Sequence, residues 1–194
     1  GIGLDKRIGS GFLNAGVGWG GSCFPKDVRS ILFTSSQYNC ELQLVQAALE
    51  VNTRQRLKVI EKLQQTLKVI RGSTIGILGL AFKPNTDDIR ESPAIAIIEE
   101  LLDMGARVKV YDPIAQEKYR QTYPGQQIVY APSALETARN SDALVFLTDW
   151  DQFRHLPWAD LGAVMNSKII IDGRNMLNSE ALAAEGFIYS GIGR

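Results

Sequence analysis

The chain has 194 residues and 45% hydrophobic content, which is enough for one sizeable core or for one domain with an attached helical part. Its formal net charge is zero, so nothing points to a nucleic-acid or anionic-membrane partner, and no apolar run approaches the ~20 residues of a membrane helix. The opening residues include neither a signal peptide's apolar core nor an initiator methionine, so we expect a piece of a longer protein. The two cysteines have different surroundings and predict no disulfide, which favours a reducing cytoplasm.

Residues 1–21 are rich in glycine, and we expect them to be mostly irregular with a short helix near residues 10–14. Phe12 and Leu13 are the main apolar anchors of this stretch. Arg7 is its notable charge, and taken alone it is typical of a solvated surface arginine.

The run GVGWGGSCFPKD, from Gly16 to Asp27, places a thiol on a glycine turn. Pro25 suits the first position of a helix and Asp27 favours its N-terminus, so Cys23 should lie where a helix begins. Cysteines at helix N-termini ionise more readily, and Lys26 adds a positive charge nearby. We interpret Cys23 as a nucleophile, with a buried structural cysteine as the alternative.

This run closely resembles the catalytic cysteine motif of the UDP-glucose 6-dehydrogenases, and the resemblance continues along the chain. It implies an NAD-dependent oxidation of UDP-glucose to UDP-glucuronate in two hydride transfers, with Cys23 as the covalent nucleophile. It also implies that Asp27 moves a proton or positions water and that Lys26 lies near NAD. The family's N-terminal NAD-binding domain has no counterpart here, so we expect the chain alone not to turn over.

The same resemblance also implies which residues line the sugar site and that the protein forms a homo-oligomer. It implies that the segment before the cysteine lines the sugar through backbone contacts, namely Phe12, Leu13, Asn14, Ala15 and Gly16, together with Gly20. Some relatives have a lysine in place of Asn14. Arg7, in an Arg-Ile-Gly element, resembles the residue that reaches a neighbouring subunit's nucleotide sugar, which implies a homodimer or a larger homo-oligomer.

Two helices are predicted next, over residues 25–38 and 42–70. The second has apolar residues at three- and four-residue steps and is long enough to link domains or to build an oligomer interface. Asn52 and Gln55 on this helix resemble a family pattern, and we give them a structural role. Arg71 and Gly72 mark a boundary, so we divide the chain into residues 1–71 and residues 72–194.

From Thr74 onward, short β-branched runs alternate with amphipathic stretches. The strands are expected at residues 74–80, 107–111, 127–130, 143–148, 168–171 and 187–189. The helices are expected at residues 93–104, 115–123, 133–140, 158–165 and 179–185. This alternation predicts an α/β domain with a doubly wound, Rossmann-like parallel sheet, which binds ligands beyond the carboxyl ends of its strands.

The loop after the first strand matches a dinucleotide fingerprint only partly, because Phe82 occupies the third glycine position. Asp112 ends the second strand, where such folds often place a ribose-binding acid, so a degenerate NAD domain is an alternative. Lys83 can supply the positive charge for a phosphate. The run AFKPNTDDIRES resembles the family's nucleotide-sugar loop, which implies Lys83 on the substrate diphosphate and Arg90 facing NAD.

The last site element is an Asp-Gly-Arg turn after the buried strand that precedes Gly173. It resembles a closing segment in which an arginine, here Arg174, contacts substrate across the dimer. His155 is the sole histidine and is interpreted as a surface or packing residue. No Cys/His cluster has metal-ligand spacing, so we predict no metal.

Three other interpretations stay open. GDP-mannose and UDP-N-acetylmannosamine dehydrogenases would share the fold and the thiol chemistry. The chain could instead be a non-catalytic nucleotide-sugar-binding and dimerising module. A plain NAD-binding regulatory domain would bind NAD and ignore UDP.

Overall fold

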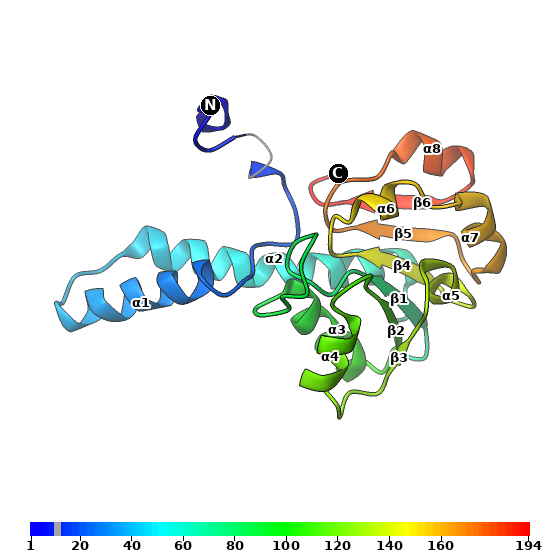
Figure 1. Cartoon of the computed structure of the whole chain (residues 1–194), viewed down its shortest axis with the longest axis horizontal. Coiled ribbons are helices and arrows are strands. Elements are labelled where there is room, and N and C mark those ends of the chain that lie inside the picture. The colour runs from blue at the N-terminus through cyan, green and yellow to red at the C-terminus, as the bar shows by residue number, and fades with distance from the viewer. Residues whose placement is uncertain (10–12) are drawn as a thin grey trace.

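The computed structural model describes residues 1–9 and 13–194 (Figure 1). A 3-10 helix η1 (Ile2–Leu4) is followed by two helices, α1 (Phe24–Gln37) and α2 (Gln43–Leu67). Strands then alternate with helices to the end of the chain. These elements are β1 (Thr74–Leu78), α3 (Pro93–Asp103), β2 (Arg107–Tyr111), α4 (Gln116–Thr122), β3 (Ile128–Tyr130), α5 (Ala134–Ala138), β4 (Ala143–Phe146), α6 (Asp151–Arg154), α7 (Trp158–Val164), β5 (Ile169–Asp172), α8 (Ser179–Ala184) and β6 (Ile188–Gly191).

The strands form one sheet in the order β3-β2-β1-β4-β5-β6, and every neighbouring pair is parallel. The chain direction across the sheet reverses between β1 and β4, where doubly wound folds bind their ligands. The predicted α/β class with a doubly wound parallel sheet is confirmed.

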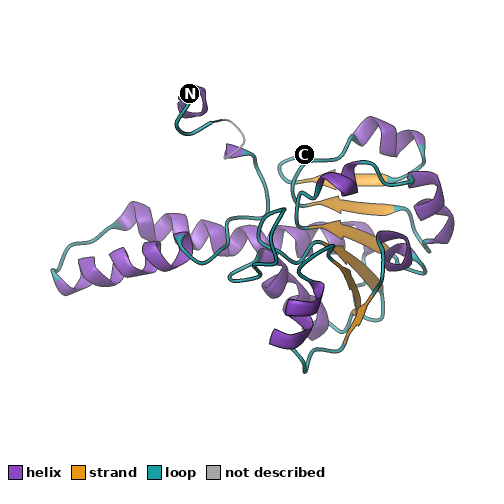
Figure 2. Ribbon diagram, in the orientation of Figure 1, coloured by secondary structure: helices purple, strands orange, loops and turns teal. Residues whose placement is uncertain are grey.

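Helices cover both faces of the sheet (Figure 2), and alternate strand residues face the two layers. On β5, Ile169 and Ile171 pack into the core shared with α2, α3 and α4, whereas Ile170 packs into the core shared with α5, α6, α7 and α8. Because the strands are buried on both faces, their sequences have apolar residues at consecutive positions.

Helices α1 and α2 form a long hairpin that projects from the sheet (Figure 1). The second half of α2 belongs to the sheet core, where Val59, Ile60 and Leu63 are buried. In α1, by contrast, only Pro25 is buried. One helix therefore joins an exposed hairpin to a packed α/β domain.

The predicted elements match the structure apart from a few boundaries and two additions, of which η1 is the first. The first strand stops at Leu78, because Gly79 turns the backbone to a φ of +101°. Helix α2 ends at Leu67 rather than at residue 70, because Lys68 has a φ of +67°. The short helix α6 was not predicted. The short helix expected at residues 10–14 lies mostly outside the described residues.

Candidate functional site

Cys23 is the N-cap residue of α1, and it is exposed. Its carbonyl accepts the Asp27 amide at 2.9 Å, and the Ser22 hydroxyl oxygen lies 3.6 Å from the Cys23 sulfur. The first amides of a helix have no intrahelical partner, so the thiol stands beside unpaired donors and the positive end of the helix dipole. The predicted placement of the thiol is confirmed, and the alternative of a buried cysteine is wrong.

Lys26 and Asp27 occupy the first turn of α1 beside the thiol. Both side chains are exposed, and the Lys26 Nζ lies 3.5 Å from an Asp27 carboxylate oxygen. An exposed pair of this kind is weak, so both groups are free to turn toward a ligand.

Helix α2 holds the glycine loop that precedes the thiol. The Trp19 amide donates to Asn52 Oδ1 at 2.8 Å, and Asn52 Nδ2 donates back to the Trp19 carbonyl at 3.3 Å. Gln55 Nε2 donates to the Gly16 carbonyl at 2.9 Å. Asn52 is buried, so these bonds replace water for the loop backbone. The structural role expected for Asn52 and Gln55 is therefore confirmed.

The same loop lies against the sheet's carboxyl edge. The buried Val17 donates its amide to the Gly173 carbonyl at 3.0 Å. At Gly16, a side chain would meet that carbonyl at 3.1 Å and the Arg174 guanidinium at 3.5 Å. At Gly20, a side chain would collide with the Glu91 carbonyl. Glycine is needed at Gly20 because two backbones approach closely there, whereas a side chain at Gly16 would require the neighbouring carbonyl to shift slightly.

Arg174 lies at the junction of three strand-end loops. Its Nε donates to the Leu147 carbonyl at 2.7 Å, and its NH2 group donates to the Phe82 carbonyl at 3.2 Å. The Asp172 carboxylate accepts the Arg174 amide and so fixes the turn. Burial lowers the pKa of the Arg174 guanidinium. Arg174 therefore places a positive charge where β1, β4 and β5 end, with further N–H donors available for an anionic ligand.

Residues 79–92 form the long loop after β1, which has Lys83 and Arg90 on its rim. Lys83 is exposed, and its Nζ lies 5.4 Å from the Phe82 ring centroid. Arg90 forms a forked pair with Asp88, at 2.9 and 2.7 Å. This pair raises the pKa of Arg90, and the nearby Cys23 adds a smaller effect in the same direction.

The structure brings the thiol loop, the loop after β1 and the turn of Arg174 into one place. The Gly21 amide donates to the Arg90 carbonyl at 2.9 Å, and Gly21 also lies against the Phe82 ring. Residues from three separate parts of the sequence thus meet at the reversal point of the sheet.

Other predicted site residues lie apart from this place. Arg7 is exposed and forms a forked pair with Asp5, at 3.0 and 2.7 Å. Leu13, Asn14 and Ala15 are exposed, on a segment that stands away from the sheet (Figure 1). Phe12 lies outside the described residues.

Asp112 has a structural task that conflicts with ribose binding. Its buried carboxylate accepts five donors from the chain itself, which are the amides of Leu80, Ala81, Ile114 and Ala115 and the Trp150 indole N–H. A carboxylate occupied in this way has no free lone pair directed at a ligand. Asp112 therefore does not support the alternative of a degenerate NAD-binding domain.

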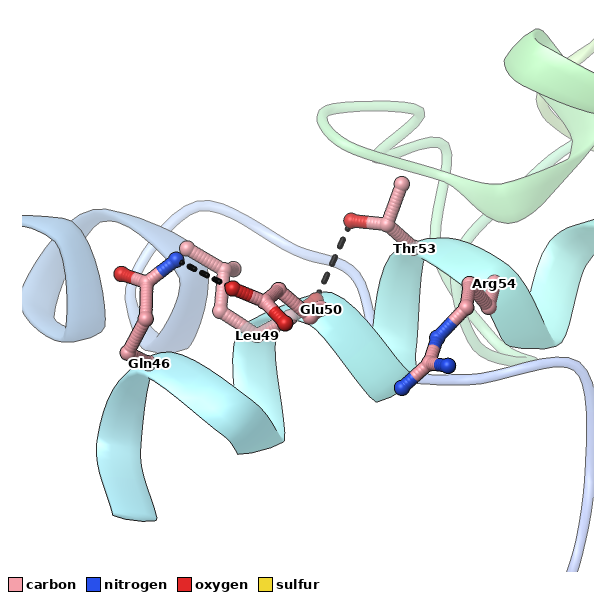
Figure 3. A pocket seen from close by; sticks show the side chains of 5 residues that line it. All are labelled: Gln46, Leu49, Glu50, Thr53 and Arg54. Carbon is pink, nitrogen blue, oxygen red and sulfur yellow. Dashed lines mark hydrogen bonds between the residues drawn. The ribbon is translucent and has the colours of Figure 1, made fainter. Parts of the chain in front are cut away.

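A hollow lies elsewhere, on the hairpin half of α2. It measures about 470 Å³ and is lined by Gln46, Leu49, Glu50, Thr53 and Arg54 (Figure 3). Gln46 donates to the Glu50 carboxylate at 2.9 Å along this surface. All five residues come from one helix, so this is a shallow groove on the helix surface. Its lining includes no predicted site residue.

The described part of the chain comprises residues 1–9 and 13–194. Within that part, no cluster of three or more His, Cys, Asp or Glu residues could hold a metal ion. In the same part, no helix is both long and apolar enough to cross a membrane.

The strand order and the charged reversal point define a doubly wound α/β domain with a thiol-bearing loop docked on it. Residues 76–179 match the model of the UDP-glucose/GDP-mannose dehydrogenase family, UDP binding domain, and residues 1–54 match that family's central domain. The chain belongs to the UDP-glucose/GDP-mannose dehydrogenase family.

Similar proteins agree with this family. The chain is 41% identical to UDP-glucose 6-dehydrogenase TuaD of Bacillus subtilis, covering 100% of this chain and 42% of that protein. It is 44% identical to UDP-glucose 6-dehydrogenase of Rhizobium meliloti, covering 100% of this chain and 44% of that protein. A solved UDP-glucose dehydrogenase from Pyrobaculum islandicum is 37% identical with a TM-score of 0.84, covering 98% of this chain and 41% of that one. The chain thus spans less than half the length of these relatives.

An ionic cluster beside the thiol loop could not be predicted from the sequence. Arg29 on α1 binds Glu91 in a forked pair, at 2.9 and 3.0 Å, and the charge of Arg56 on α2 also lowers the pKa of Glu91. The three residues are far apart in the sequence, so no local pattern could join them.

Proposed function

We propose that this chain is the thiol-bearing and nucleotide-sugar-binding portion of an NAD-dependent UDP-glucose 6-dehydrogenase. The observation that carries the proposal is the docking of the Cys23 loop onto the sheet's reversal point, beside Lys83 and Arg174. The names of the similar proteins support UDP-glucose as the substrate. Turnover needs a polypeptide of the relatives' length, which we call the full-length enzyme.

The substrate diphosphate binds Lys83, and Arg174 adds a second contact. The exposed ammonium of Lys83 on the rim and the half-buried guanidinium of Arg174 supply positive charge where strand-end ligands bind. The sugar contacts the backbone of Gly16 and Gly20 beside the Cys23 loop, with residues 12–15 as the further backbone contacts that the family motif implies.

The reaction oxidises the primary alcohol at C6 to a carboxylate. NAD, when bound, would supply the hydride acceptor for two successive oxidations at C6. Between them the Cys23 thiolate attacks the aldehyde carbon, a carbon–sulfur bond forms, and the carbonyl oxygen gains a proton. The second oxidation leaves a thioester, which water cleaves to UDP-glucuronate and the free thiol. Asp27, one turn along α1, takes the water's proton or orients that water.

The α/β domain of this chain does not fit NAD, because chain donors fill the Asp112 carboxylate. The rim of the thiol site does fit one side of an anionic cofactor, because Arg90 and Lys26 are exposed cations beside Cys23. We propose that these two residues contact NAD held by another part of the full-length enzyme.

We propose that the chain assembles as a homodimer or a larger homo-oligomer. Large apolar side chains are exposed along the α1–α2 hairpin, including Phe24, Ile31, Phe33, Tyr38 and Leu44. Exposed apolar stretches of this kind mark interaction surfaces. The projecting segment with Arg7 would then reach a neighbouring subunit's site. The two free cysteines support a cytoplasmic location.

Residues 1–71 and 72–194 are proposed as the two parts of the chain, with α2 contributing to both. Within the same family, GDP-mannose and UDP-N-acetylmannosamine remain alternative substrates. A non-catalytic nucleotide-sugar-binding module is the alternative for the chain alone.

A substrate panel with the full-length enzyme tests the proposal. We expect NADH formation with UDP-glucose at a kcat/KM at least about 100-fold above that with GDP-mannose or UDP-N-acetylmannosamine. The 194-residue chain alone should give no NADH. Preference for another nucleotide sugar would overturn the proposal that UDP-glucose is the substrate. Turnover by the 194-residue chain alone would overturn the proposal that the full-length enzyme is needed.

A further inference from the structure

We propose that Glu91 is a positioning residue, which sets the place of Cys23 by clamping helix α1 to the nucleotide loop. The inference rests on the proposed function for its catalytic meaning. Its structural basis is the forked pair that joins Glu91 to Arg29, 62 positions away in the sequence.

The clamp spans the two elements that must cooperate. Arg29 lies on α1, less than two turns after Cys23, and Glu91 directly follows Arg90 in the loop after β1. Both Arg29–carboxylate distances, 2.9 and 3.0 Å, are those of a two-point hydrogen-bonded pair. A forked pair fixes direction as well as distance, so it restrains rotation of α1 about its own axis.

Few other contacts hold this end of α1. Pro25 is the only buried residue of the helix, and Phe24 is 58% exposed. The other attachments include the edge-on contact between the Phe24 and Trp19 rings, with centroids 5.3 Å apart, and the Gly21 amide on the Arg90 carbonyl in the loop before the helix. Because apolar packing is sparse here, a polar clamp has a larger share in placing the thiol than it would in a packed core.

The backbone and side chain of Glu91 act at the same spot. Its φ of +53° is unusual for a residue with a side chain, and the next residue, Ser92, caps α3. The Glu91 carbonyl lies against Gly20, while its carboxylate faces α1. One residue therefore touches the thiol loop, the thiol helix and the start of α3.

A second cation adds to the pull on this carboxylate. Arg56 on α2 is half-buried, and burial lowers its pKa while Glu91 opposes that effect. Its Nε is buried and has no hydrogen-bond partner among the described residues. The pKa of Glu91 is lowered, first by its hydrogen bonds to Arg29. Glu91 is thus hydrogen-bonded to Arg29 of α1, and the charge of Arg56 on α2 lowers its pKa further.

The test is a double-mutant cycle in the full-length enzyme, with Glu91→Gln, Arg29→Ala and the double variant. We expect each single change to lower kcat about tenfold, with the KM for UDP-glucose changed less than about twofold, because the thiol is displaced while the nucleotide contacts remain. The double variant should be no worse than either single one. Glu91→Asp should recover part of the loss. The control Glu61→Gln removes an exposed partner of Lys58 on α2 and should change nothing.

Hydrogen exchange of the 194-residue chain gives a second readout that needs no turnover. Glu91→Gln should speed exchange of the α1 amides about fivefold and leave the sheet unchanged. If the wild type does not oxidise UDP-glucose, the proposed function fails and the clamp is judged on this exchange. Additive losses in the cycle, an unchanged kcat, or unchanged exchange in α1 would each overturn the proposal.

Discussion

The two halves of α2 are built on different principles. In the half that covers the sheet, Val59 and Leu63 are fully buried in a continuous core. In the hairpin half, Leu44 is 88% exposed and Val51 is 52% exposed, and the polar Asn52 is the buried residue. Stability is therefore concentrated at the sheet, whereas the thiol loop is placed by the buried Val17 and a few directed polar contacts. Helix α2 therefore attaches the thiol-bearing region to the stable α/β domain.

The largest effect should come from the thiol itself. Cys23→Ser in the full-length enzyme should lower the rate of UDP-glucuronate formation by at least about 10³-fold, because a hydroxyl is a far weaker nucleophile. The unfolding midpoint should not move, since Cys23 is exposed. Cys40→Ser is the matched control, and it should keep full activity. Product formation measured by chromatography checks the prediction, and a loss of under tenfold in Cys23→Ser would contradict it.

Next in size is the sheet half of α2. Leu63→Ala should lower the free energy of unfolding by about 2–4 kcal/mol, because it removes a fully buried side chain and leaves a cavity. Leu57→Ala, on the same helix but 45% exposed, should cost less than about 0.5 kcal/mol. Urea denaturation of the 194-residue chain compares the two. Equal costs would mean that the two faces of α2 do not differ as described.

A smaller effect is expected where α2 holds the glycine loop. Asn52→Ala should cost about 1–3 kcal/mol, because the Trp19 amide and carbonyl lose their partner. The neighbouring Arg54→Ala should be nearly neutral because Arg54 is exposed. Denaturation gives the cost, and Trp19 fluorescence reports the loop. An unchanged stability with Asn52→Ala would show that water replaces the amide at no cost.

The smallest effect is the pH dependence of the Glu91 pair. The folded pKa of Glu91 lies below its usual 4.5, so the pair's stabilisation is present above that value and lost as pH falls through the folded pKa. At pH 7, Glu91→Gln should cost no more than about 1 kcal/mol, since the pair is partly exposed. Unfolding measured from pH 7 to pH 3 should show the wild-type advantage shrinking at the acid end. If the wild type instead became more stable relative to Glu91→Gln toward pH 3, the prediction would be contradicted.

Much of the fold could be predicted because the α/β signal is local. Short β-branched runs between amphipathic stretches predicted the parallel sheet, and Pro25 with Asp27 predicted the helix start at Cys23. The helix end at Lys68 could not be predicted, because nothing in its neighbourhood demands a positive φ. Helix α6 has four residues, which is too short to show a period.

Candidate-site residues could be predicted where they belong to one contiguous motif. They could not be predicted where folding brings distant residues together. The loop of Cys23 and the loop of Lys83 each read as one run of sequence. The five-donor task of Asp112 and the cluster of Arg29, Arg56 and Glu91 depend on tertiary contacts between distant segments. Such contacts follow from the folded topology, which a local pattern does not contain.

Calorimetric titration of the 194-residue chain with UDP-glucose, and then with NAD, tests the central claim most directly. We predict binding of UDP-glucose, weakened at least about tenfold by Lys83→Ala and unchanged by Lys58→Ala on the surface of α2. We predict no heat from NAD alone, because the Asp112 carboxylate is already filled. Binding of NAD without binding of UDP-glucose would contradict the account and remove the roles proposed for Lys83 and Arg174.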